Sequence, residues 1–309
     1  MERLSEDQFA YLLLAPIFLL VGTLGIYPLV RVLDMSLHAD SLASSNLIGD
    51  FVGLTNYVEL FTGQRTAILT RPFANLSQPF KSALPVTFIF TIAAGTLSTL
   101  FGFAAALLLN ESFKGRSLAR VAILLPWATP IVIQGMAFFL MFQNGIGFAI
   151  EPLNDLGLVS ANPLASSQDT LMVAILADTW KFFPFMALLI LAGLQSIDPT
   201  YYRVARVAGA SRWQRFKTIT LPLVMPALMI ALLFRLLRGL KVYGLFESLT
   251  QSGCSTLTSL TCLLVLEFNG ARYGTASAIG FSTALVIAVT ILTYLLVVRR
   301  FLPEGAQRF

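Results

Sequence analysis

The chain of 309 residues is 56% hydrophobic and only 12% charged, and it carries a net charge of +5 at pH 7. Because a soluble domain carries about 25% charged residues, this composition excludes an ordinary soluble globule and indicates a protein whose solvent is lipid. The basic balance is typical of loop charges that fix membrane orientation, so we expect no nucleic-acid partner. His38 is the only histidine, which excludes a multi-histidine metal site. Neither a phosphate-binding G-x-x-x-x-G-K-S/T loop nor a G-x-S-x-G nucleophile motif is present, so no nucleotide site is expected.

Six apolar runs are long enough, or nearly so, to cross a bilayer core of about 30 Å, which needs about 20 helical residues. In chain order they cover residues 9–30, 84–109, 121–142, 171–194, 221–241 and 275–298. The first run is too long for the core of a signal peptide and lacks a basic start, so we expect it to be retained. The sequence therefore predicts an all-α membrane protein in which residues 1–309 form a single transmembrane domain.

Lys and Arg are distributed unevenly between alternate loops. With the N-terminus in the cytoplasm, twelve lie on the cytoplasmic side and eight toward the outer side, three of these eight within the fifth run, as the positive-inside rule favours. We therefore expect both termini and residues 195–220 to be cytoplasmic. In the first outer loop, "FVGLTNYVELF" (51–61) predicts a short surface helix with Thr55 or Asn56 as its N-cap.

A compact basic stretch precedes the fifth run. Five of the 21 Lys and Arg residues fall within residues 201–223, and no acid does. Asp198 as N-cap and Pro199 at the first helical position predict a helix start. Gly209 can end that helix in a left-handed conformation, and Ser211 can cap a second one.

Trp213 and Phe216 are three apart on this second helix, so they share a face. A basic helix attracted to anionic lipid would explain the charge of the stretch. It would explain neither the Gly-Ala step at the bend nor the aromatic pair. We therefore favour two short helices at a sharp bend that fit a groove on another protein.

At this point the chain resembles a known family: the permease subunits of bacterial and archaeal ATP-binding-cassette (ABC) importers of the maltose-type carbohydrate-uptake group. Those subunits carry a cytoplasmic motif of the form E-A-A-x-x-D-G-A-x5-F-x2-I-x-L-P. The matching residues here are Ala205, Gly209, Ala210, Phe216, Ile219, Leu221 and Pro222. Further matches are "GIYPLV", "GLTNY", "LLLNESFKGRSLAR", "LLPWATPIV" and "YGTASA", and their order along the chain makes the resemblance specific.

The resemblance implies a type I importer fold with six core spans and a cytoplasmic coupling helix, here residues 199–208. It implies a second permease, often a homologous chain, two ABC ATPase subunits and an extracytoplasmic solute-binding protein. The subunit would translocate a disaccharide or oligosaccharide by alternating access in the cell membrane. It would be no enzyme and bind no cofactor, because ATP and Mg²⁺ would be held by the ATPase subunits.

We call residues 195–220 the coupling loop. Its predicted contacts with the ATPase are Tyr202, Arg203, Arg206, Gly209, Ala210, Arg212 and Phe216. The sequence departs from the family motif at Arg203, which replaces Glu, at Val204, which replaces Ala, and at Ala208, which replaces Asp. The reversed charge at Arg203 implies either a compensating acid on the ATPase or an intact motif on the other permease, and it favours a partner chain of different sequence.

Charged residues also lie at membrane depth. Asp178 and Lys181 are three apart in the fourth run, and Arg235 and Arg238 are three apart in the fifth, so each pair can share a face. An ionisable residue in a span costs at least about 2.5–3.5 kcal/mol and usually faces a cavity. Two readings stay open: these charges pair with one another and lock the two spans, or they line a substrate pathway.

In the resembled family the substrate-contacting segments are these same two spans. The predicted pathway residues are Asp178, Lys181, Phe182, Phe185, Arg235, Arg238 and Tyr243, with Trp180 as a further ring. Aromatic faces with planar polar groups suit a sugar. The positive excess leaves an anionic or phosphorylated polyol open as an alternative.

Two other functional classes fit less well. An ion-coupled secondary transporter would show an internal repeat and interrupted helices, and we find neither clearly in the sequence. A membrane enzyme would need a nucleophile with a base, or a metal cluster. The segment 249–260 is expected to be a flexible outer segment that faces the binding protein or forms an outer gate. Pairing of its Cys254 with Cys262 cannot be decided from sequence.

Overall fold

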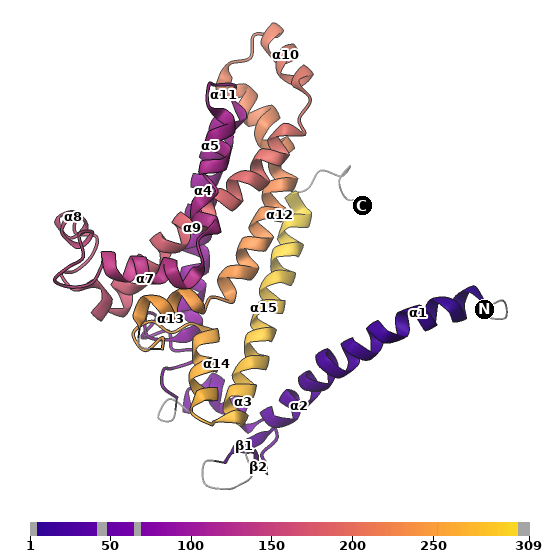
Figure 1. Cartoon of the computed structure of the whole chain (residues 1–309), viewed down its shortest axis with the longest axis vertical. Helices are drawn as coiled ribbons and strands as arrows, with labels where there is room; N and C mark the ends of the chain where they lie inside the picture. Colours follow the sequence, from indigo (N-terminus) through magenta and orange to yellow (C-terminus); the bar gives the residue numbers. More distant parts are fainter. Residues whose placement is uncertain (1–4, 42–47, 65–68, 252, 302–309) are drawn as a thin grey trace.

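The computed structural model describes residues 5–41, 48–64, 69–251 and 253–301, and in this part it is built almost entirely of helices (Figure 1). Five helical segments there are long and apolar enough to cross a membrane: Asp7–Ser36, Ala83–Asn110, Ser167–Gln195, Arg212–Leu240 and Tyr273–Arg300. A sharply bent pair of helices makes the sixth crossing when it is counted as one span. The predicted all-α membrane fold is confirmed.

The first span combines α1 (Glu6–Leu20), a π-helical segment (Val21–Ile26) and α2 (Tyr27–Ser36). It begins at a capping box, in which the Ser5 hydroxyl accepts from the Gln8 backbone N–H and the Gln8 side chain accepts from the Ser5 N–H. None of its most apolar window is buried, and α1 runs away from the other helices in Figure 1. This apolar surface must be covered by lipid or by another subunit.

The first outer loop forms a two-stranded antiparallel sheet, β1 (His38–Asp40) and β2 (Ile48–Phe51), followed by α3 (Thr55–Thr62). The short helix predicted here is confirmed, but its N-cap is Leu54 rather than Thr55 or Asn56. Asn56 is buried instead, and its side-chain N–H groups donate to the carbonyls of Ser36 and His38, both at 2.8 Å. A tertiary contact therefore uses the side chain that could have capped the helix.

Four long helices pack around the centre: α4 (Ala83–Asn110), α9 (Ser167–Gln195), α12 (Leu221–Leu240) and α15 (Tyr273–Phe301). Helices α4 and α9 cross closely at Gly102. A Cβ atom at that position would lie 2.6 Å from the Cβ atom of Met186, so a larger residue would force the helices apart. Phe90, Ala94, Met186 and Ile190 are fully buried in the resulting core.

The third span is not the single helix predicted for residues 121–142. It consists of α5 (Arg116–Ala122), α6 (Leu125–Ala128) and α7 (Ile131–Met141), with a bend of 85° between the α5–α6 segment and α7. Pro130 causes the break, because it has no N–H to donate and forces Thr129 out of the helical region. Thr129 has ψ of 129°, and Pro130 becomes the N-cap of α7.

Short helices flank the long ones: α8 (Ile150–Asp155), a 3₁₀ turn (Pro163–Ala165), α13 (Gly244–Thr250) and α14 (Leu260–Asn269). In Figure 1, α14 lies near the end of the bundle that carries α3, whereas α8 stands off to one side. A disulfide joins Cys254 to Cys262, which decides the pairing that the sequence left open. At this end the Asp40 carboxylate accepts from the backbone N–H of Thr275 (2.8 Å) and from its hydroxyl, in the first turn of α15.

Candidate substrate pocket and coupling loop

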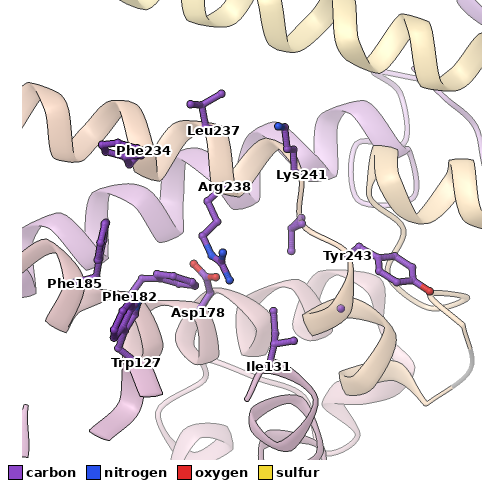
Figure 2. A pocket seen from close by; sticks show the side chains of 12 residues that line it. Trp127, Ile131, Asp178, Phe182, Phe185, Phe234, Leu237, Arg238, Lys241 and Tyr243 are labelled. Carbon is purple, nitrogen blue, oxygen red and sulfur yellow. The ribbon is translucent and has the colours of Figure 1, made fainter. Parts of the chain in front are cut away.

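A cavity of about 480 Å³ opens beside the middle of the bundle, and we call it the central cavity. It lies where the broken third span meets α9, α12 and the start of α13 (Figure 2). Its lining residues are Trp127, Ile131, Asp178, Phe182, Phe185, Phe234, Leu237, Arg238, Lys241, Val242, Tyr243 and Gly244. Five of the predicted pathway residues are therefore brought together: Asp178, Phe182, Phe185, Arg238 and Tyr243.

Arg235 lies behind the cavity wall. Its side chain is 2% exposed and forms an ion pair with Asp178, while its Nε–H donates to the Ser98 hydroxyl at 2.9 Å. These contacts tie α12 to both α9 and α4. For Arg235 the structure therefore favours the interpretation in which intramembrane charges pair and lock the spans.

Lys181 does not pair with Asp178, although the two are three apart on α9. Its ammonium group is buried and donates to the backbone carbonyls of Trp127 (3.2 Å) and Thr129. These carbonyls belong to the end of α6, where the break in the third span leaves acceptors without helical partners. Lys181 is thus outside the cavity lining, and it fixes the broken span to α9.

Trp180, expected as an additional ring of the pathway, is also outside the cavity lining. It is 41% exposed and contacts Phe138 of α7 with a ring-centroid distance of 6.0 Å. The ring that does line the cavity is Trp127, which is 46% exposed and stacks on Phe185 at 6.0 Å with an interplanar angle of 17°. Trp127 reaches this position because the third span breaks directly after it.

Arg238 presents its guanidinium group to the central cavity. The group lies 4.4 Å from the centroid of the Phe182 ring and extends toward Asp178 in Figure 2. Lys241 and Phe234 also contribute to the lining but were not among the predicted pathway residues. Their spacing from Arg238 on α12, three and four residues, is the signal that could have included them. The cavity therefore offers aromatic faces and a planar hydrogen-bond donor side by side.

The coupling loop folds as its sequence predicts. Asp198 caps α10 (Pro199–Val207) by accepting from the Thr200 N–H at 2.8 Å, and the hydrogen bonds from Thr200 hold the pKa of this carboxyl below its usual range. Gly209 follows the helix with φ of +80°, a left-handed conformation that residues with a side chain rarely adopt. Ser211 and Gln214 form a capping box on α11 (Arg212–Arg215).

The aromatic residues of the coupling loop anchor it to the bundle. Phe216, in a π-helical segment (Phe216–Thr220), stacks on Trp213 at 5.4 Å and meets Phe103 of α4 edge-on at 5.9 Å. The Tyr202 hydroxyl hydrogen-bonds the Thr220 hydroxyl at 3.0 Å. Tyr202 and Phe216 were predicted to contact the ATPase, but in the structure both face the membrane domain.

The outer face of α10 is exposed and mixed in character. Arg203 and Arg206 are exposed, and their guanidinium groups donate within one turn, to the Thr200 hydroxyl at 2.9 Å and to the Tyr202 carbonyl at 3.4 Å. Three exposed apolar residues that the sequence analysis missed alternate with them: Tyr201, Val204 and Val207, which are 58%, 63% and 91% exposed. Their i, i+3, i+6 spacing places them along one side of the helix. Of the remaining predicted contacts, Arg212 is exposed and Ala210 donates its N–H to the Ala205 carbonyl at 2.9 Å.

Residues 98–303 match a protein family described as the binding-protein-dependent transport system inner membrane component. The chain belongs to this family. It is 34% identical over 298 residues to the trehalose/maltose transport system permease protein MalF of Thermococcus litoralis, with 96% of each chain covered. It is 32% identical over 292 residues to the trehalose transport system permease protein SugA of Mycobacterium tuberculosis, covering 93% of this chain and 88% of that one.

Solved structures confirm the fold. A chain in the crystal structure of a bacterial ABC transporter involved in the import of the acidic polysaccharide alginate matches with a TM-score of 0.74 and 24% identity, covering 95% of this chain and 96% of that one. The fold is that of a type I ABC importer permease, as the resemblance implied. The protein is thus a multi-pass membrane permease subunit of a binding-protein-dependent ABC importer.

Proposed function

We propose that this permease imports a sugar, a disaccharide or a short oligosaccharide, and that the sugar passes through the central cavity. The observation that carries the proposal is the combination of stacked rings with a guanidinium donor in that cavity. Ligand sites are largely apolar and aromatic, with a few polar groups that fix orientation. The names of the two relatives, permeases for trehalose or maltose, support the sugar assignment.

The two chemical faces of a sugar match the two kinds of side chain in the cavity. Trp127 and Phe185 form one aromatic wall, against which the C–H face of a pyranose ring can pack. Arg238 carries five N–H donors in a fixed plane, which can serve neighbouring hydroxyl oxygens. Tyr243 adds a further ring at the opposite side of the cavity in Figure 2.

The outer face of α10 provides the docking surface for an ABC ATPase subunit in this proposal. Exposed apolar residues flanked by arginines are the composition of a protein-binding helix rather than of a solvated loop. A second permease subunit, two ATPase subunits and a solute-binding protein complete the complex. ATP and Mg²⁺ belong to the ATPase subunits, and this chain contributes no hydrolytic site.

The orientation we propose places the termini and α10 in the cytoplasm. The Cys254–Cys262 disulfide supports it, because structural disulfides persist in oxidising compartments and are rare in the cytosol. It lies between α13 and α14, at the end of the molecule opposite α10 in Figure 1. The segment 249–260 would then face outward, toward the binding protein.

In this proposal, transport depends on a continuous helical connection between the coupling loop and the central cavity. The π-helical segment after α11 runs directly into α12, which carries Arg235 and Arg238. Closure of the ATPase pair would move α10 and α11 and shift α12 against α9, so that the cavity opens alternately to the two sides. The broken third span is a feature that ion-coupled transporters also use, but family membership favours ATP-driven transport here.

The test is uptake by the complete complex, this chain with its second permease and ATPase subunits, reconstituted in proteoliposomes. We expect labelled trehalose or maltose to accumulate only when both ATP and the binding protein are supplied on their proper sides. A complex with a catalytically inactive ATPase subunit is the control and should show no uptake. Uptake driven by an ion gradient without ATP would contradict the proposal, as would uptake of a non-sugar solute alone.

A further inference from the structure

The charges around the central cavity are not balanced. Asp178 is the single acid among the cavity-lining residues in the described part of the chain. Its carboxylate is already in an ion pair with Arg235, which is buried and also bonded to Ser98. One carboxylate therefore faces two guanidinium groups, those of Arg235 and Arg238, and one positive charge is left over.

The excess charge resides on Arg238. Its guanidinium group lies over the Phe182 ring at 4.4 Å and is exposed to the cavity. Within residues 5–41, 48–64, 69–251 and 253–301, its side chain forms neither a hydrogen bond nor an ion pair. Arg235, one turn earlier on the same helix, has both kinds of partner.

Two neighbouring lysines supply no counter-charge for Arg238, and both are directed elsewhere. Lys181 is held by the carbonyls of Trp127 and Thr129 and points away from the lining. Lys241 lies at the rim, and its ammonium group points away from Asp178 and Arg238 in Figure 2. Glu247 lines a different cavity, with Val132 and Met136. Arg238 is thus a cation presented to a largely apolar space at membrane depth.

We propose that Arg238 determines substrate specificity by selecting an acidic sugar, one that carries a carboxylate or a chemically similar oxyanion. This inference rests on the proposed function as a sugar importer. A guanidinium group binds a carboxylate through two parallel charge-assisted hydrogen bonds. The Phe182 ring fixes the plane of the guanidinium group. A neutral sugar would leave the extra positive charge without a counter-ion at a depth where an unpaired charge is costly.

The experiment measures binding by the complete complex in lipid nanodiscs without the binding protein, so that only the permease selects. The probes are trehalose and the derivative in which one 6-hydroxymethyl group is oxidised to a carboxylate, compared by equilibrium dialysis. Because charge-assisted hydrogen bonds are markedly stronger than neutral ones, the wild type should bind the acidic form about tenfold more tightly.

Three variants of the chain sharpen the result. R238Q should lower affinity for trehalose about threefold, because it removes donors to the sugar hydroxyls, and affinity for the acidic sugar about thirtyfold, which abolishes the preference. R238K keeps the charge without the planar fork, so it should retain part of the preference. R31Q, which removes an exposed arginine at the end of α2, is the matched control and should leave both affinities unchanged.

The two proposals fail in different ways. Equal or tighter binding of trehalose by the wild type, or equal losses for both sugars in R238Q, would overturn the role of Arg238 while leaving sugar transport in place. The second of these results is also what pairing of Arg238 with an acid of the second permease would give. Binding of neither sugar, with no ATP-driven uptake of either, would overturn the sugar assignment itself.

Discussion

The basic residues of the coupling loop and those of the central cavity are held in opposite ways. Arg203 and Arg206 are exposed and bond to groups three and four residues away. Arg235 is buried and bonds to groups 57 and 137 residues away, and Lys181 to carbonyls 52 and 54 residues away. Local partners leave a charge available to another protein, whereas distant partners use the charge to join spans. Arg238 belongs to neither group, since it lies in the cavity over the Phe182 ring and its side chain forms no hydrogen bond or ion pair with the residues that the structure describes.

The largest effect in this comparison is expected from breaking the buried ion pair. Asp178→Asn leaves Arg235 buried without its counter-charge, and breaking such a pair costs about 3–5 kcal/mol. The change should lower the thermal stability and folded yield of the complex. Arg31→Met removes a pair with Asp34 whose side chains are 51% and 46% exposed, and it should cost less than about 1 kcal/mol. Equal losses in the two variants would contradict the role given to the buried pair.

A smaller loss is expected when Lys181 is changed to Met. Its ammonium group holds the carbonyls at the break of the third span, and hydrogen bonds of charged groups contribute about 1.5–3 kcal/mol. Because the break positions Trp127, sugar affinity should also fall. Lys181→Arg should keep more of the stability and of the sugar affinity than Lys181→Met does. Thermal stability and dialysis measure the two effects. Loss of stability with unchanged sugar affinity would show that Lys181 does not position the cavity wall.

At the bend of the coupling loop, Gly209→Val should uncouple ATP hydrolysis from transport. A Cβ at this position would contact nothing within 4 Å, so the effect comes from the backbone, where a left-handed residue with a side chain costs roughly 1–2 kcal/mol. Gly209→Asn is the matched control, because Asn tolerates this conformation. The readout is the ratio of sugar molecules taken up to ATP hydrolysed, which should fall for Val and hold for Asn. An unchanged ratio in the Val variant at normal expression would remove Gly209 from the coupling mechanism.

The smallest effect on stability is expected from a single substitution beside the disulfide, which tests orientation. Cys254 and Cys262 are buried, so the probe is Gln251→Cys at an exposed position close to them. In intact cells an impermeant maleimide should label this variant and leave the wild type unlabelled. Labelling only after the membrane is broken would place this end of the molecule in the cytoplasm and reverse the proposed orientation.

The sequence separation between bonded residues also explains which contacts could be predicted from the sequence. Asp198, Gly209 and Ser211 were assigned correctly because capping is decided within a few residues. Pairing of the intramembrane charges between the two spans was one of two open interpretations, but the individual partners of Asp178 and Lys181 were not assigned. Helical spacing gives the residues that share a face but not the helix that packs against it. The contact between Arg235 and Asp178 depends on how α12 lies on α9, which spacing alone does not contain.

The break in the third span is indicated by the sequence, although the uninterrupted apolar run of residues 121–142 favoured a single helix. "LLPWATPIV" contains two prolines, and the second one forces the residue before it out of the helix. Reading that proline as a break would have placed Trp127 at a helix end and made it a candidate for the cavity. Trp180, which lies between Asp178 and Lys181 in the sequence, was expected as a pathway ring instead.

These two tryptophans provide the most direct test of the central claim that the sugar passes through the cavity. They are similarly exposed, at 46% and 41%, but only Trp127 lines the cavity. The measurement is the KM of ATP-driven disaccharide uptake into proteoliposomes by the Trp127→Ala and Trp180→Ala complexes. The account predicts that Trp127→Ala raises the KM about tenfold, a change of about 1.4 kcal/mol, while Trp180→Ala stays within about twofold of wild type. Equal effects of the two substitutions, or a larger effect of Trp180→Ala, would contradict it.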